Sequence, residues 1–77
     1  MPPQFILYQR DDCHLCDLAL EVLAQAHAPE FDSVFIDGSE ALEARYGARI
    51  PVLRDAVREV ELDWPFDADG LRQWLLL

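Results

Sequence analysis

The sequence contains no lysine and only two cysteines, and each shortage excludes a class of protein. All six basic residues among the 77 are arginines, so chemistry that uses a lysine amine as a nucleophile or Schiff base is excluded. Two cysteines are too few for a secreted scaffold held together by disulfides. No apolar run approaches the roughly 20 residues that span a bilayer. We therefore expect a soluble protein.

Charge and length restrict the partners further. Fifteen acidic residues against six basic ones give a formal net charge of −9, which argues against nucleic acid or an anionic membrane as a partner. A chain of 77 residues allows one domain, residues 1–77. Because Met1–Gln4 lacks the basic start of a signal peptide, we expect a cytoplasmic location.

The first half of the chain predicts a strand, a helix and a second strand. Residues 4–8 form a continuous apolar run, typical of a strand buried on both faces. Apolar residues then recur at helical spacing from about Cys13 to His27, with Asp12 as the expected N-cap. Residues 31–37 predict a second buried strand that ends in a turn.

The second half predicts a short helix, a hairpin and a final helix. The short helix runs from Ser39 or Glu40 to Tyr46, and Gly47 is expected to end it in the left-handed conformation. Residues 50–53 and 57–62 predict two antiparallel strands joined at Asp55-Ala56, and Asp67 can cap a C-terminal helix. The order is βαβαββα, which predicts an α/β domain with a four-stranded mixed sheet flanked by three helices.

The cysteines form the motif Cys13-His14-Leu15-Cys16 between the first strand and the first helix. Three residues apart on a helix, the two sulfurs lie on one side, with a Cα separation of roughly 5 to 6 Å that suits a disulfide. The free N–H groups at the helix start favour a thiolate at Cys13, the candidate nucleophile. Cys16, one turn further in, would resolve the mixed disulfide.

Nearby charges would tune this pair in opposite directions. Arg10 would stabilise a thiolate at Cys13, whereas the carboxylates of Asp11, Asp12 and Asp17 would oppose it. His14, if it faced the sulfur as a cation, would make the pair more oxidising.

Other uses of the two cysteines stay open. The motif could supply half of a zinc or iron–sulfur site shared across a dimer, although His14 and His27 are the only further soft ligands within the chain. The cysteines could also pack as small apolar residues, or the domain could be an interaction module without activity. We predict no metal in the chain itself.

Together, the motif, the element order and the Ile50-Pro51 pair about 35 residues downstream resemble the glutaredoxin branch of the thioredoxin-like family. The resemblance covers nearly the whole chain and implies a three-layer thioredoxin-like fold of the glutaredoxin type. It implies a cis Pro51 beside the cysteines, with Ile50 pairing with the substrate backbone, although an ordinary trans proline is the alternative. It also implies that Arg10 and Arg49 contact glutathione carboxylates, unless both are solvated surface charges.

The sequence departs from this family in two places. The residues between the cysteines are His14-Leu15, and the glycine pair that would receive the γ-glutamyl end of glutathione is replaced by residues 63–67, Asp-Trp-Pro-Phe-Asp. We therefore predict a small thiol–disulfide oxidoreductase, with Cys13 and Cys16 catalytic and with Arg10, His14, Arg49, Ile50 and Pro51 binding the substrate. It requires no bound cofactor. Its partners would be a disulfide-containing protein or glutathione and a reductase system, with glutathione a candidate reductant or co-substrate.

Overall fold

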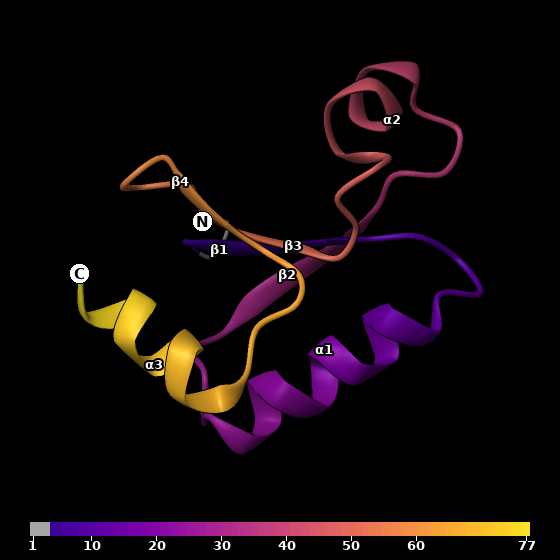
Figure 1. Cartoon of the computed structure of the whole chain (residues 1–77). Coiled ribbons are helices and arrows are strands. Elements are labelled where there is room, and N and C mark those ends of the chain that lie inside the picture. The colour runs from indigo at the N-terminus through magenta and orange to yellow at the C-terminus, as the bar shows by residue number, and fades with distance from the viewer. Residues whose placement is uncertain (1–3) are drawn as a thin grey trace.

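The computed structural model describes residues 4–77, which form a four-stranded mixed sheet with helices on both faces (Figure 1). The sheet order is β2-β1-β3-β4, with β1 parallel to β2 and antiparallel to β3, and β3 antiparallel to β4. Figure 1 shows α1 and α3 on one face and α2 on the other. The predicted element order and three-layer fold are confirmed. The elements are β1 (Phe5–Gln9), α1 (His14–Gln25), β2 (Phe31–Phe35), α2 (Glu40–Tyr46), β3 (Val52–Asp55), β4 (Val60–Asp63) and α3 (Ala68–Leu76).

Each face of the sheet has its own apolar core. The larger core lies under α1 and α3, where the rings of Phe5 and Trp74 meet with centroids 6.2 Å apart. The smaller lies under α2 and contains Ile36, Tyr46 and Val52. Because side chains alternate along a strand, the central strand β1 serves both cores. This double burial explains why its sequence is a continuous apolar run.

The second strand differs from its prediction. β2 ends at Phe35 rather than at residue 37, and it is a half-exposed edge strand instead of a buried one. Asp32, Ser33 and Phe35 are exposed, while Ile36 is buried just beyond the strand. An edge strand has a partner strand on one side only. Apolar residues at its end are therefore a poor sign that both faces of the strand are buried.

The hairpin also differs from its prediction. The strands are Val52–Asp55 and Val60–Asp63, joined by residues 56–59 rather than by Asp55-Ala56. The buried carboxylate of Asp55 accepts hydrogen bonds from the backbone N–H groups of Val57 and Arg58, both at 3.0 Å. Glu59 then has a φ of 56°. A side chain that binds the backbone ahead of it builds this longer turn.

Gly47 ends α2 with a φ of −53°, so the left-handed end predicted for this helix is wrong. Glycine is required there for space, because a Cβ would lie 2.5 Å from the Glu43 backbone oxygen. The cap expected from Asp67 is present, since its carboxylate accepts the Gly70 N–H at 2.7 Å. Within residues 4–77, none of the helices combines the length and apolar character needed to cross a membrane.

Candidate redox site

The two cysteines lie at the start of α1 and are joined as a disulfide, with their Cα atoms 5.2 Å apart. Cys13 is the N-cap of the helix, and its sulfur accepts the backbone N–H of Cys16 at 3.1 Å. This corrects the expected cap at Asp12, which instead has a φ of 53° in the preceding loop. The helix begins one residue later than predicted and ends at Gln25 rather than His27.

The exposure of the two sulfur-bearing residues is unequal. Cys13 is half-buried, whereas Cys16 is only 1% exposed. Cys13 also sits at the positive end of the helix dipole and has a backbone N–H directed at its sulfur. An attacking thiolate needs both solvent access and stabilisation of its charge, and Cys13 has both.

The loop before Cys13 is tied to the β2–α2 connection. The Ile36 N–H donates to the Gln9 oxygen at 2.8 Å, and the Asp11 N–H donates to the Asp37 carboxylate at 3.1 Å. These bonds fix the end of β1, from which the chain turns into α1. The sheet thereby sets the position of the helix start and of its disulfide.

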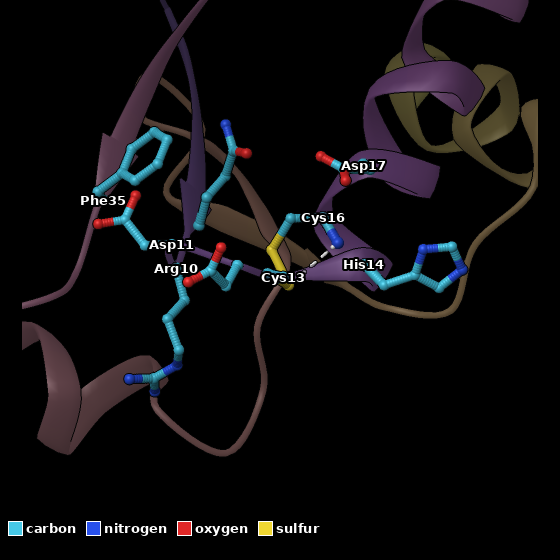
Figure 2. Close-up of a pocket in the computed structure, with 9 residues that line it drawn as sticks. Arg10, Asp11, Cys13, His14, Cys16, Asp17 and Phe35 are labelled. Atoms are coloured by element: carbon cyan, nitrogen blue, oxygen red, sulfur yellow. Dashed lines mark hydrogen bonds between the residues drawn. A yellow bond between two sulfur atoms is a disulfide. The ribbon is translucent and has the colours of Figure 1, made fainter.

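A pocket of about 470 Å³ opens beside the disulfide (Figure 2). Three aspartates and one arginine contribute its charge, and exposed Phe35 contributes an apolar wall. The lining residues are Gln9, Arg10, Asp11, Asp12, Cys13, His14, Cys16, Asp17 and Phe35. Sequence reasoning missed Phe35, because its strand was expected to be buried.

Arg10 and His14 line this pocket, but the guanidinium of Arg10 and the ring of His14 do not face the sulfurs. Figure 2 shows the His14 ring directed away from the disulfide and the Arg10 guanidinium extending toward another element. Arg10 donates to Glu43 at 2.5 and 3.2 Å and to the Gly47 oxygen at 3.3 Å. The hydrogen bond to Glu43 raises the Arg10 pKa above its ordinary value, so this guanidinium stays charged.

The other three predicted substrate-binding residues, Arg49, Ile50 and Pro51, lie in the connection from α2 to β3 and do not line the pocket. The Ile50–Pro51 peptide bond is cis and Pro51 is buried. A second cis bond, at Trp64–Pro65, follows β4 in the segment that replaces the glycine pair, where Trp64 packs edge-on against Phe66.

Arg49 is held by two carboxylates of β4. It donates to Asp63 at 2.7 and 3.1 Å and to Glu61 at 2.7 Å, and these hydrogen bonds raise its pKa. Glu61 also accepts from Arg45, Arg54 and the Tyr46 hydroxyl. Sequence reasoning missed this role of Glu61. Arg54 and Glu61 face each other across the hairpin, and this pair of opposite charges was the signal available in the sequence. It can be recognised only when the register of the hairpin is known.

Among residues 4–77, no three His, Cys, Asp or Glu side chains are grouped as a metal site would require. What this part of the chain offers is a dithiol or disulfide at a helix start. The chemistry open to it is exchange with an outside sulfur.

Comparison with known proteins assigns the fold and the motif to a family. The family model for the glutaredoxin-like domain (DUF836) matches residues 4–76, and the chain belongs to this family. No curated protein matches the chain.

Three solved structures resemble this one. The X-ray structure of target protein XcR50 from X. campestris is 66% identical, covers 92% of this chain and 93% of its own, and superposes with a TM-score of 0.88. The solution structure of the same target is 64% identical over 95% of this chain and 92% of its own, with a TM-score of 0.87. The solution structure of protein Ne2328 from Nitrosomonas europaea is 32% identical over 96% of this chain and 92% of its own, with a TM-score of 0.70.

Proposed function

We propose that this protein is a thiol–disulfide oxidoreductase that works through Cys13 and Cys16 in the cytoplasm. The observation that supports this most directly is the pairing of a half-exposed Cys13, at a helix N-terminus, with a buried Cys16 close enough to form a disulfide. The family match supports the same chemistry.

The exchange has two steps. The Cys13 thiolate attacks one sulfur of the substrate disulfide, forms a mixed disulfide and releases the other sulfur as a thiolate. The Cys16 thiolate then attacks the Cys13 sulfur and releases the second substrate thiolate. The substrate gains two electrons and two protons, and the protein loses them as the Cys13–Cys16 bond forms. Glutathione or a dithiol reductase would return the electrons.

Substrates are disulfides in proteins or glutathione mixed disulfides. The residues of the α2–β3 connection, Arg49, Ile50 and Pro51, would shape the groove for the substrate chain, while Arg10 and His14 stand at the pocket beside Cys13. No bound cofactor takes part in this reaction.

The test is reduction of insulin and of a glutathione mixed disulfide, with glutathione and a thioredoxin reductase system supplied separately. Cys13→Ser should abolish turnover, because no nucleophile remains. Cys16→Ser should accumulate a covalent mixed disulfide, seen as added mass on the intact protein. Leu15→Ala, within the same turn, is the matched control and should retain both steps.

Thermal unfolding of each reduced variant shows whether it is folded. If folded Cys13→Ser turned over at the wild-type rate, or if the wild type reduced neither substrate with either reductant, the proposal would be wrong.

A further inference from the structure

Every arginine of this chain is paired with one of its own carboxylates. The sequence has no lysine, so these six guanidinium groups are all its permanent side-chain cations. The pairs are Arg10–Glu43, Arg45–Glu61, Arg49–Glu61, Arg49–Asp63, Arg54–Glu61, Arg58–Asp55 and Arg72–Asp69.

This pairing occupies the two arginines expected to receive glutathione. Arg10 is engaged by both oxygens of Glu43, and Arg49 by both oxygens of Asp63 with Glu61 in addition. Two-point contacts of this kind are the strongest that arginine makes with a carboxylate. A glutathione carboxylate would have to displace a partner that the fold holds in place, and an attached partner competes at a high effective concentration.

The carboxylates beside the disulfide have no such partners. Asp11, Asp12 and Asp17 line the pocket, are exposed and make no ion pair with any described residue. Figure 2 shows Asp11 near Phe35 on one side of the sulfurs and Asp17 on the helix side. The charge facing an approaching substrate is therefore negative, since the one arginine of the pocket is already neutralised by Glu43.

The pocket also offers apolar contact beyond what a small thiol needs. Phe35 is 48% exposed at its wall. Exposed apolar side chains beside a reactive group suit the side chains that flank a cysteine in a protein.

From these observations we propose that the site selects disulfides carried by positively charged protein segments and discriminates against glutathione. Lysine or arginine side chains next to the substrate cysteine would lie against Asp11, Asp12 and Asp17. This inference rests on the exchange reaction proposed above and names its substrate class. Charge complementarity acts mainly on the rate of encounter, by factors of about 10 to 1,000 that fall as salt is added.

The test is a single-turnover reaction of pre-reduced protein with cyclic peptides of one disulfide spacing, flanked by lysine, glutamine or glutamate. No external reductant is needed, because the protein dithiol supplies both electrons. Each rate is divided by that of the uncharged dithiol dithiothreitol with the same peptide, which removes differences in intrinsic disulfide reactivity. Oxidised glutathione is the fourth substrate.

We expect the lysine peptide to react at least about tenfold faster than the glutamate peptide at low ionic strength, and oxidised glutathione to resemble the glutamate peptide. The ratio should fall toward one at about 1 M salt, where the screening length is roughly 3 Å.

Two variants with the same change in net charge locate the effect. Asp11→Asn/Asp12→Asn/Asp17→Asn removes the charges of the pocket and should reduce the lysine-to-glutamate ratio to within about threefold of unity. Glu30→Gln/Asp32→Asn/Glu59→Gln changes three exposed carboxylates outside the pocket and should leave the ratio at the wild-type value.

The outcomes separate the two proposals. If no peptide is reduced, the exchange reaction itself is wrong. If all four substrates are reduced at equal normalised rates, the reaction stands and the charge selection is wrong. The selection is equally wrong if oxidised glutathione is the fastest substrate, or if the control variant loses the ratio as completely as the pocket variant does.

Discussion

Asp55 is a carboxylate with no exposure to solvent, at the end of β3. It accepts hydrogen bonds from Gln4 at 2.9 Å, from the Val57 and Arg58 N–H groups, and from the Arg58 guanidinium at 2.5 Å. Burial alone would raise its pKa, but the bonds from Arg58, Gln4 and Val57 outweigh burial and lower it to about 2. A buried charge is tolerated here because each neighbour stabilises its ionised form.

Asp55→Asn should therefore destabilise the protein by about 2 kcal/mol at pH 7, because the amide lacks the charge and offers one acceptor oxygen. In a domain of this size, that lowers the melting temperature by roughly 10 °C. Asp69→Asn is the matched control, since this carboxylate is 86% exposed and pairs only with Arg72, so its loss should cost less than about 1 kcal/mol. Thermal unfolding at pH 7 measures both. Equal losses would contradict the role given to Asp55.

At the scale of elements, α2 has only seven residues and depends on the sheet beneath it. Tyr46 in its last turn stacks on Tyr8 of β1 with ring centroids 4.1 Å apart, and its hydroxyl donates to Glu61 of β4 at 2.7 Å. Burial, followed by this hydrogen bond, raises the Tyr46 pKa well above its ordinary value. One side chain thus joins the helix to two strands.

Removing that hydroxyl with Tyr46→Phe should cost about 1 to 2 kcal/mol, because a hydrogen bond to a charged acceptor is lost. Tyr8→Phe removes a hydroxyl that makes no side-chain hydrogen bond to residues 4–77, so it should leave stability within about 0.5 kcal/mol of wild type. Urea unfolding gives both values. A Tyr8→Phe loss as large as that of Tyr46→Phe would contradict the role given to the hydrogen bond between Tyr46 and Glu61.

The sequence predicted best those elements whose signal lies in residues close together along the chain. The helical spacing after Cys13 and the apolar run of β1 each depend on neighbours a few residues away, so α1, its cysteines and the central strand were predictable. The edge position of β2 depends on which strands pair, and the turn after β3 depends on one buried carboxylate, so both were mispredicted. The pairing of Arg10 with Glu43 spans 33 residues and leaves no local trace.

At the scale of the whole molecule, stability should fall in acid. Glu61 is partly buried, which raises its pKa, but hydrogen bonds from Arg49, Tyr46 and Arg54 outweigh this and lower it to about 2. Asp55 is likewise lowered to about 2 from 3.8. A carboxylate whose pKa is lower in the folded state stabilises the protein at pH values above its unfolded-state pKa. This stabilisation is lost as the carboxylate binds a proton. The contribution is complete above about pH 4.5 and disappears as the pH falls toward 2.

We therefore expect the free energy of unfolding to drop steeply between about pH 4.5 and 2, by several kcal/mol in total from the two carboxylates. Urea titrations at half-unit pH intervals measure this. Glu61→Gln should flatten the slope in that range, whereas Glu30→Gln, at an exposed position, should not. A pH-independent free energy across this range would contradict the role assigned to both groups.

The contact between Phe5 and Trp74 joins the first strand to the last helix across the larger core. During synthesis, the central strand leaves the ribosome long before its partner in α3 has been made. The nascent chain therefore carries an open apolar sheet face until residue 74 emerges, and this face can close only once α3 has left the ribosome.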